Sequence, residues 1–593
     1  MNNSGVSAVN DVNTVLEVDN LSVDFIGDGC RRNVVKNVSF TLKKGTTLGI
    51  VGESGSGKSV SSMSIMRLLK MPPASMSGSV LFSPGNGQPP VDLLALSESQ
   101  MLQFRGRHIA MIFQEPMTSL NPVQKCGMQV VEMLLAHEKV SFQEARARTL
   151  ELFNDVKLPR PEQIFDAYPH EISGGQKQRV MIAMALICHP SILIADEPTT
   201  ALDVTVQKAI VELLKDLQQK YGIAIIFISH DLGVVAQIAS EVAVLYKGEI
   251  VETGETSKVL CHPQHPYTQG LLACRPPLDS RPRHLTTLAD YMGGTASTAD
   301  EPVSLAESES PDAALPPTSQ QKDILLSVNH LCVEYVLKKN IWGKPLQTLA
   351  AVDDVSFSLF RGETLGLVGE SGCGKSTLGR AIMRLIEAKS GEVVFDGVRL
   401  DSLSSREMKK MRTKIQIVFQ DPYSSLNPRL TVGEAIMEPL KQFGSIVADG
   451  RYANSQDRKR RVIELLEQVG LSEEHFYRYP HEFSGGQRQR ICIARALVLE
   501  PELVICDESV SALDVSVQAQ VLNLLNDLKE KYHYTYLFIT HDLSVVKFMS
   551  DRIIVMQKGK IVEQGSAEEL YKAPQTEYTR NLLSAIPRIV FDR

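Results

Sequence analysis

The stretch that decides the fold is GIVGESGSGKS at Gly49–Ser59, which returns in the second half of the chain as GLVGESGCGKS at Gly366–Ser376. In each copy an apolar run precedes the pattern G-x-x-x-x-G-K-S, and a stretch suited to a helix follows it. Glycines at these positions let backbone N–H groups turn toward a phosphate, the lysine supplies positive charge, and the serine hydroxyl can reach Mg²⁺. The sequence therefore predicts two phosphate-binding loops (P-loops), each joining a strand to a helix.

Other patterns are also written twice, in the same order. They are MIFQEPMTSLNP (Met111–Pro122) and IVFQDPYSSLNP (Ile417–Pro428), YPHEISGGQKQR (Tyr168–Arg179) and YPHEFSGGQRQR (Tyr479–Arg490), ILIADEPTTALDV (Ile192–Val204) and LVICDESVSALDV (Leu503–Val515), and IIFISHDL (Ile225–Leu232) and YLFITHDL (Tyr536–Leu543). Apolar runs that alternate with helical stretches, such as Leu48–Val51, Ile192–Ala195 and Ile223–Ile228, predict an α/β fold. A chain of 593 residues with this repeat is expected to form two such domains.

Composition predicts where these domains begin and end. We expect an N-terminal tail at residues 1–14, a first domain at 15–274 and a second domain at 324–593. Residues 275–323, rich in Pro, Ser, Ala and acidic side chains without apolar periodicity, predict a flexible linker. SPGNGQPP at Ser83–Pro90 predicts a longer surface loop in the first copy.

The bulk properties exclude several kinds of protein. A net charge of -7 argues against a nucleic-acid binder, and the short basic run Arg458–Arg461 is expected to be a solvated helix face. Nine cysteines without a CxxC pair predict neither a disulfide framework nor a zinc site. The first residues lack the pattern of a signal peptide, and no apolar run reaches the ~20 residues that span a bilayer.

Acidic pairs end the third repeated pattern. Asp196 and Asp507 suit Mg²⁺ binding, and the carboxylates that follow them, Glu197 and Glu508, can orient a water for attack on a γ-phosphate.

The order P-loop, FQ-x-P, SGGQ, apolar-DE, ALD and H-D resembles that of the ATP-binding cassette (ABC) family over nearly the whole chain. This resemblance implies two P-loop NTPase cassettes in tandem, each with a RecA-like core, an antiparallel β subdomain and a helical subdomain that carries the SGGQ signature. It also implies ATP and Mg²⁺ as cofactors. No motif is degenerate in either copy, so two hydrolytic sites are predicted. The residue before the signature is Ile172 or Phe483 instead of the commoner Leu, an apolar exchange of little consequence.

The resemblance assigns roles residue by residue. It implies catalytic carboxylates at Glu197 and Glu508, switch histidines at His230 and His541, Q-loop glutamines at Gln114 and Gln420, and D-loop residues at Asp203 and Asp514. The implied Mg²⁺ ligands are Ser59, Gln114, Asp196, Ser376, Gln420 and Asp507. The implied ATP-binding residues are Gly52, Glu53, Ser54, Gly55, Ser56, Gly57, Lys58, Ser59 and Val60 in the first P-loop, and Gly369, Glu370, Ser371, Gly372, Cys373, Gly374, Lys375, Ser376 and Thr377 in the second. Phe25 and Tyr335 stand where the family often places an aromatic ring under adenine, although aromatic residues of strands also serve packing. Cys373 replaces Ser56 and is expected to be a small filler.

Cassettes of this family pair head to tail. Lys58 would then share one ATP with Ser484, Gly485, Gly486 and Gln487, and Lys375 would share the other with Ser173, Gly174, Gly175 and Gln176. A helix start behind the paired glycines would stabilise γ-phosphate charge.

Finer resemblance favours an importer ATPase of the peptide/nickel group. It rests on the SLNP stretches, on YPHE, and on the tails HPQHPYTQGLL (His262–Leu272) and APQTEYTRNLL (Ala573–Leu583). The first half resembles the D-type ATPase of di- and oligopeptide importers, and the second half the F-type. The implied partners are two permease subunits, contacted around Gln114–Ile172 and Gln420–Phe483, and an extracytoplasmic solute-binding protein, at the cytoplasmic face of a bacterial inner membrane. Only Cys261 and Cys274 follow the first cassette, so the iron–sulfur motif of some relatives is not expected.

Two alternatives stay open within the same superfamily. Tandem ABC proteins that act on ribosomes use charged helical linkers and basic surfaces, unlike the acidic Pro/Ser-rich stretch here. DNA-repair ATPases insert long modules between P-loop and signature, for which this chain leaves no room. The solute itself, whether peptide, glutathione or nickel, is not determined by these motifs.

Overall fold

The computed structural model describes residues 13–27, 30–84, 88–114, 119–200, 202–292, 323–339, 345–444, 450–587 and 589. The chain forms two compact units: unit 1 comprises Met1–Leu272 with Pro587–Arg593, and unit 2 comprises Ala273–Ile586. The predicted tail at 1–14 lies outside the described residues up to residue 12, and so do residues 293–322 of the predicted linker.

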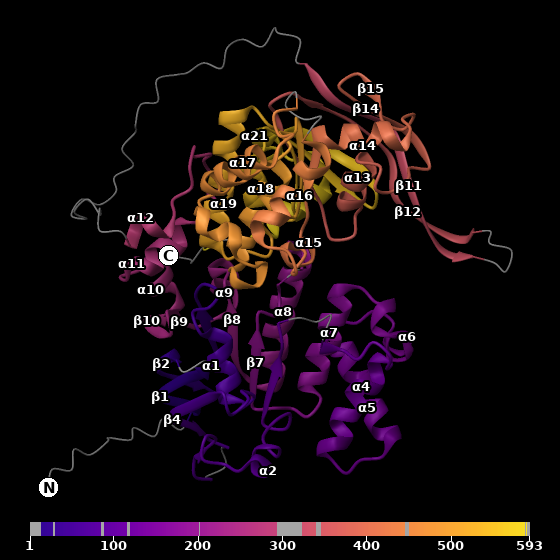
Figure 1. Ribbon diagram of the computed structural model, residues 1–593. Coiled ribbons are helices and arrows are strands. Elements are labelled where there is room, and N and C mark those ends of the chain that lie inside the picture. Colours follow the sequence, from indigo (N-terminus) through magenta and orange to yellow (C-terminus); the bar gives the residue numbers. More distant parts are fainter. Residues whose placement is uncertain are drawn as a thin grey trace. The chain divides into compact units, whose positions relative to one another are not determined.

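Unit 1 contains a four-stranded antiparallel sheet and a six-stranded mixed sheet, with helices around them (Figure 1). Its strands are β1 (Thr14–Gly27), β2 (Cys30–Lys43), β3 (Thr47–Val51), β4 (Ala74–Phe82), β5 (Val91–Asp92), β6 (Ile109–Ile112), β7 (Ile192–Asp196), β8 (Ala224–Ser229), β9 (Glu241–Tyr246) and β10 (Glu249–Glu255). Its helices are α1 (Lys58–Ile65), α2 (Glu98–Met101), α4 (Cys126–His137), α5 (Phe142–Asp155), α6 (Pro161–Asp166), the 3-10 turn Pro169–Glu171, α7 (Gly174–Leu186), α8 (Val204–Tyr221), α9 (Leu232–Ile238), α10 (Thr256–Cys261) and α11 (Pro266–Ala273).

Unit 2 repeats this plan. Its strands are β11 (Ile324–Lys339), β12 (Pro345–Phe360), β13 (Thr364–Val368), β14 (Ser390–Phe395), β15 (Val398–Arg399), β16 (Ile415–Val418), β17 (Leu503–Asp507), β18 (Thr535–Ile539), β19 (Arg552–Gln557) and β20 (Lys560–Ser566). Its helices are α12 (Leu288–Met292), α13 (Lys375–Ile382), α14 (Ser405–Lys414), α15 (Pro422–Ser425), α16 (Val432–Phe443), α17 (Ser455–Gln468), the 3-10 turns Glu473–Tyr477 and Pro480–Glu482, α18 (Gly485–Leu497), α19 (Val515–Tyr532), α20 (Leu543–Met549), α21 (Ala567–Lys572) and α22 (Glu577–Ser584).

The large sheets have the strand orders β10-β9-β3-β8-β7-β6 and β16-β17-β18-β13-β19-β20. All neighbours are parallel except the edge pairs β9–β10 and β19–β20. Strands β3, β7, β13 and β17 are buried along their whole length, as expected for parallel strands covered on both faces. The predicted two-domain α/β fold is confirmed.

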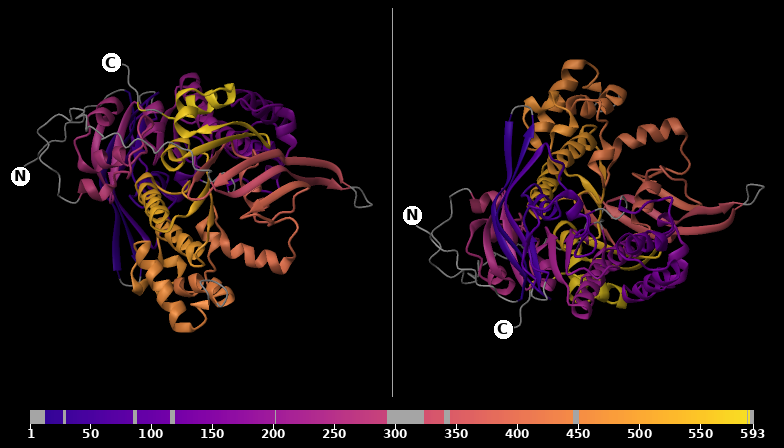
Figure 2. Two further views of the ribbon diagram at one scale, coloured as in Figure 1. Left: turned by 90° about the horizontal axis from the view of Figure 1, so that it is seen from above. Right: turned by 90° about the horizontal axis from the view of Figure 1, so that it is seen from below.

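A helical group and a small antiparallel sheet complete each unit. In unit 1, helices α4 to α7 gather together beside the six-stranded sheet (Figure 1). In unit 2, β14 pairs with β11 only from Leu326 to Cys332, so the outer part of β11 and β12 forms a long two-stranded ribbon, clear in both views of Figure 2. Among the described residues, no helix has both the length and the apolar character that a membrane span requires.

Residues 273–292, which we call the strap, follow the first cassette but pack on unit 2. The Arg281 guanidinium donates to the carbonyl of Phe548 at 3.0 Å and pairs with Asp551 at 3.1 Å, at the end of α20. The Leu285 backbone exchanges two hydrogen bonds with the Asn523 side chain on α19, both 2.8 Å long. Leu285 is only 3% exposed. Residues 275–292 are therefore held against unit 2, unlike the flexible linker expected at 275–323. A few well-spaced leucines can anchor a stretch that has no helical periodicity.

Candidate active site

The predicted catalytic segments of unit 1 follow four neighbouring parallel strands. The P-loop follows β3, His230 follows β8, Glu197 follows β7 and Gln114 follows β6. Carboxyl ends of parallel strands share one edge of a sheet, where α/β proteins bind their ligands. In unit 2 the same edge carries the P-loop after β13, His541 after β18, Glu508 after β17 and Gln420 after β16.

The P-loops have the backbone that phosphate binding requires. Gly57 and Gly374 stand at the N-caps of α1 and α13 with φ of 104° and 107°, a conformation that favours glycine. Lys58 is buried, and its Nζ donates to the carbonyls of Gly52 at 2.6 Å and Glu53 at 2.8 Å. Lys375 Nζ does the same in unit 2, at 2.7 and 2.9 Å. Each loop thus brings a buried lysine and the start of a helix together in one turn of backbone.

The aspartates meet the P-loop serines. The hydroxyl of Ser59 donates to Asp196 Oδ1 at 3.1 Å, and that of Ser376 donates to Asp507 Oδ1 at 2.6 Å. Burial raises the pKa of Asp196 to about 6, despite the hydrogen bond from Ser59, and burial also raises the pKa of Asp507. A buried carboxylate and a hydroxyl side by side form an oxygen ligand pair that a hard cation suits.

In both Glu197 and Glu508, the carboxylate oxygen Oε2 contacts more than one side chain. Glu197 Oε2 accepts from Gln114 Nε2 at 3.0 Å and from the Thr200 hydroxyl at 2.9 Å, and it lies 3.4 Å from His230 Nδ1. Burial pushes the pKa of Glu197 up, but His230, Thr200 and Lys58 outweigh burial and lower the pKa to about 2. Glu197 has a positive φ of 46°, which turns it out of the strand direction.

Unit 2 repeats this cluster with one change. Glu508 Oε2 accepts from Gln420 Nε2 at 2.8 Å and lies 3.3 Å from His541 Nδ1. Burial opposes ionisation of Glu508, yet hydrogen bonding and charge from His541 lower its pKa below the usual value. Ser511, which replaces Thr200, donates instead to the Glu508 backbone carbonyl at 2.9 Å. Glu197 therefore accepts from a hydroxyl donor that Glu508 lacks in this arrangement.

The SGGQ segments stand at helix starts outside these clusters. Ser173 caps α7 and Ser484 caps α18, and in both cases Gln at the third helical position closes a capping box. Ser173, Gly174 and Ser484 are exposed, while Gly175 and Gly486 face Val206 and Val517 on α8 and α19. Asp203 caps α8 by accepting from the Val206 backbone N–H at 2.9 Å.

The aromatic candidates differ in their surroundings. Tyr335 lies on β11, and its hydroxyl is 3.4 Å from that of Thr377 in the first turn of α13. Phe25, at the matching position on β1, packs against the core of unit 1 and is half-buried. A stacking role under adenine stays a prediction for both.

Cys373 and Ser56 lie beneath the two P-loops. Both are buried, and a Cβ at Gly369 or Gly52 would meet them at 2.8 and 2.9 Å. Burial raises the pKa of the Cys373 thiol, so the thiol stays protonated at neutral pH. This environment suits a space-filling side chain.

Sequence reasoning missed three kinds of contact. It assigned no role to Thr200, although a hydroxyl recurs three residues after Glu197 and Glu508, nor to Thr377 beyond the P-loop itself. It also missed Tyr267 and Tyr578, whose hydroxyls accept hydrogen bonds from P-loop amides. The signal was visible, because both tails place a tyrosine at the same position.

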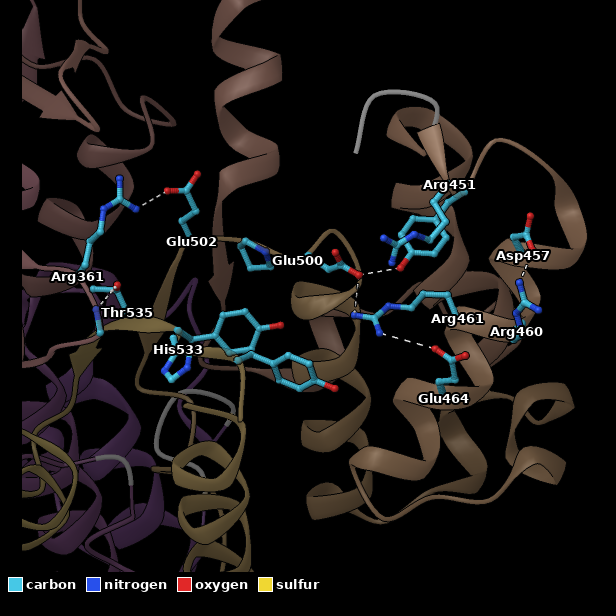
Figure 3. Close-up of a pocket in the computed structure, with 15 residues that line it drawn as sticks. Arg361, Arg451, Asp457, Arg460, Arg461, Glu464, Glu500, Glu502, His533 and Thr535 are labelled. Carbon is cyan, nitrogen blue, oxygen red and sulfur yellow. Dashed lines mark hydrogen bonds and ion pairs between the residues drawn. The ribbon is translucent and has the colours of Figure 1, made fainter. Parts of the chain in front are cut away.

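A cavity of about 930 Å³ lies at the opposite end of the unit 2 sheet, near the starts of β13, β17 and β18 (Figure 3). Several of its charged side chains pair with one another: Arg361 with Glu502 at 2.7 Å and Arg460 with Asp457 at 2.5 Å. Arg461 of α17 is only 7% exposed and pairs with Glu500 at 3.2 Å. The expected solvated face at Arg458–Arg461 is therefore wrong for Arg461, because its helical position turns it toward Glu500. The Arg461–Glu500 ion pair links α17 to the segment before β17. The cavity lies at the end of the sheet away from the P-loop.

Known protein families and related proteins match this chain over most of its length. A family model described as "ABC transporter" matches residues 35–200 and 352–511. A second, described as "Oligopeptide/dipeptide transporter, C-terminal region", matches residues 251–299 and 562–593. The chain is 48% identical to the glutathione import ATP-binding protein GsiA of Salmonella choleraesuis over 97% of this chain and 90% of that protein. It is 46% identical to the protein of that name from Escherichia coli K12, with the same coverage. Among solved structures, a dimeric ATP-binding cassette bound to ADP and Pi matches 41% of this chain and 98% of its own, with 30% identity and a TM-score of 0.36.

Proposed function

Because this chain belongs to the ABC transporter family and is an ATPase with two cassettes, we propose that it supplies the energy for an importer of small peptides, with glutathione as the first solute to test. One observation carries the proposal. A C-terminal region shared with oligopeptide/dipeptide transporters follows each cassette, in a chain that aligns with glutathione import ATP-binding proteins over 97% of its length. No observation favours an action on ribosomes or DNA.

In the proposed reaction each P-loop holds the phosphates of ATP. Lys58 and Lys375 would each direct one ammonium N–H to the phosphate oxygens while another stays on the carbonyl of Gly52 or Gly369, and the starts of α1 and α13 would add backbone N–H donors. Phe25 and Tyr335 are assigned to the adenine ring.

Mg²⁺ fits beside Ser59 and Asp196, and beside Ser376 and Asp507. These residues supply hydroxyl and carboxylate oxygens, and a cation there would offset the burial that raises the pKa of both aspartates. The amide nitrogens of Gln114 and Gln420 donate to Glu197 and Glu508, and we assign their amide oxygens as further Mg²⁺ ligands. When bound, Mg²⁺ would neutralise charge on the β- and γ-phosphates.

Glu197 and Glu508 would orient the attacking water. Glutamine and histidine hold Oε2 of each glutamate, which fixes the carboxylate, and we assign Oε1 to the water. The lowered pKa of both glutamates keeps them ionised at neutral pH and able to accept a hydrogen bond from water.

We further propose that the two ATP sites are composite. Each signature is exposed at a helix start, so the N–H groups of α7 and α18 remain available to a phosphate held by the other cassette. One site would combine Lys58 with Ser484–Gln487, and the other Lys375 with Ser173–Gln176. Two permease subunits at the cytoplasmic face of the inner membrane, and an extracytoplasmic solute-binding protein, complete the proposed importer.

Uptake measurements test this proposal. The gene is deleted, and entry of labelled glutathione, a labelled dipeptide and ⁶³Ni²⁺ is followed in cells that carry the wild-type gene, the Glu197→Gln/Glu508→Gln gene or an empty vector. We expect glutathione or dipeptide uptake to require the wild-type gene. Unchanged uptake of all three solutes after deletion would refute an importer of this group.

A further inference from the structure

Each cassette is followed by a short helix that carries a tyrosine at the same position. The tails HPQHPYTQGLL and APQTEYTRNLL form α11 and α22, which place Tyr267 and Tyr578 second in their helices. Both lie within the residues matched to the oligopeptide/dipeptide transporter C-terminal region. Nothing in the ATPase reaction described above uses them.

Both tyrosines contact the P-loop of their own unit. The Glu53 backbone N–H donates to the Tyr267 hydroxyl at 3.0 Å, and the Glu370 N–H donates to the Tyr578 hydroxyl at 3.1 Å. Tyr267 is fully buried, with its ring 4.2 Å from that of Tyr246. The second unit has Gln557 where the first has Tyr246, so the hydrogen bond recurs although the surroundings differ.

The same peptide group also binds the P-loop lysine. Its carbonyl, that of Gly52, accepts from Lys58 Nζ at 2.6 Å, and the equivalent Gly369 carbonyl accepts from Lys375 Nζ at 2.7 Å. Because a peptide group is planar, fixing the direction of its N–H fixes the direction of its C=O. Lysine, peptide and tyrosine therefore form one hydrogen-bonded chain, whose members polarise and strengthen one another.

The sheet closes the other side of this peptide. A Cβ on Gly52 would lie 2.2 Å from the Leu245 carbonyl oxygen, and one on Gly369 would lie 2.2 Å from that of Met556. The two glycines have φ of 151° and 153°. The first peptide of each P-loop is thus confined between the end of β9 or β19 and the tail helix.

We propose that Tyr267 and Tyr578 are positioning residues that set the P-loop of their own cassette for ATP. Each hydroxyl orients the first P-loop peptide, and through it the lysine ammonium, so the tail helix adjusts ATP affinity without touching the nucleotide. The inference depends on the ATPase activity of the chain and not on the transported solute.

The test replaces both tyrosines in the full chain, as Tyr267→Phe/Tyr578→Phe, which removes the hydroxyls and keeps the rings. We expect ATP to bind about tenfold more weakly, as the loss of about 1.4 kcal/mol predicts, with a matching rise in KM for ATP and kcat within twofold of wild type. Hydrogen exchange in the fragments that contain Glu53 and Glu370 should accelerate. Tyr246→Phe and Tyr571→Phe are matched controls, since they remove hydroxyls next to α11 and on α21 without contacting a P-loop amide.

The melting temperature of each variant, measured by thermal unfolding, distinguishes a loss of P-loop positioning from a general loss of stability. An unchanged KM in the double variant overturns the proposal, and so does a rise equal to that of the controls. A fall in kcat with unchanged ATP affinity also overturns it. Loss of solute uptake without these changes would bear on the importer alone, because ATP binding is measured on the purified chain.

Discussion

Replacing the two glycines of a signature with alanine, one at a time, should affect stability at one position and ATP hydrolysis at both. A Cβ at Gly486 would stand 2.2 Å from Val517 Cγ1, whereas one at Gly485 would meet nothing within 4 Å. Neither glycine has a positive φ, and both lie in the first turn of α18. The two variants therefore differ in steric surroundings and share the same helix.

The magnitude follows from these distances. Val517 is β-branched and held in α19, so it must retreat by more than 1 Å to reach the 3.4 Å at which ordinary contact begins. Overpacking of this kind costs about 1–3 kcal/mol, partly offset by the ~0.5–1 kcal/mol that alanine gains over glycine inside a helix. Gly486→Ala should lower the free energy of unfolding by about 1–2 kcal/mol, and Gly485→Ala should leave it unchanged or slightly higher.

Denaturant unfolding and ATPase assays on the full chain measure both effects. Gly485→Ala should still impair ATP hydrolysis, because its methyl group would stand between the signature and the proposed γ-phosphate. Val517→Ala should relieve Gly486→Ala, with a favourable coupling of about 1–3 kcal/mol in a double-mutant cycle. Equal stability of the two glycine variants, or no coupling to Val517, would refute the steric reasoning.

Three further changes address other parts of the molecule. Glu197→Gln with Glu508→Gln should keep ATP binding but lower ATPase turnover by about 10²–10⁴-fold, since a neutral amide can still accept a hydrogen bond from water but cannot take up its proton; full turnover would contradict their assignment. Tyr335→Ala should weaken ATP binding by about 1–3 kcal/mol if the ring stacks on adenine, with Tyr335→Phe near wild type in a nucleotide titration. Arg281→Ala should destabilise unit 2 by about 1–2 kcal/mol in denaturant unfolding, because it loses a carbonyl contact and an ion pair. The more exposed Arg283→Ala, which loses only its pair with Glu530, should cost less, and equal losses would contradict an anchoring role for Arg281.

The repeated motifs predicted the fold and most of the candidate site. Motif order places the P-loop, Asp-Glu pair, glutamine and histidine after successive apolar strands, and parallel pairing brings those strand ends together. The carboxylate contacts of Gln114 and His230 follow from this arrangement.

Contacts that depend on tertiary packing were harder to predict. The strap contains too few apolar residues to show periodicity, and its partners on α19 and α20 lie more than two hundred residues away in sequence. Arg461 was expected in solvent because a run of four basic residues looks hydrated, whereas the helix turns one of the four inward. The matching tyrosines of the two tails are visible in the sequence, but their contacts join them to P-loop residues more than two hundred positions away.

The strap also has a practical consequence for dividing the gene. A fragment that begins at Ile324, where β11 starts, would omit Leu285 and Arg281 and leave bare the apolar surface and the α20 end that they cover. Burying one leucine side chain contributes about 1.5–3 kcal/mol, a large share of the stability of an ordinary domain. A fragment that carries the second cassette alone should start at Ala273, where unit 2 begins. Swapping halves with a related protein at the apparent linker would likewise pair one parent's strap with the other parent's α19.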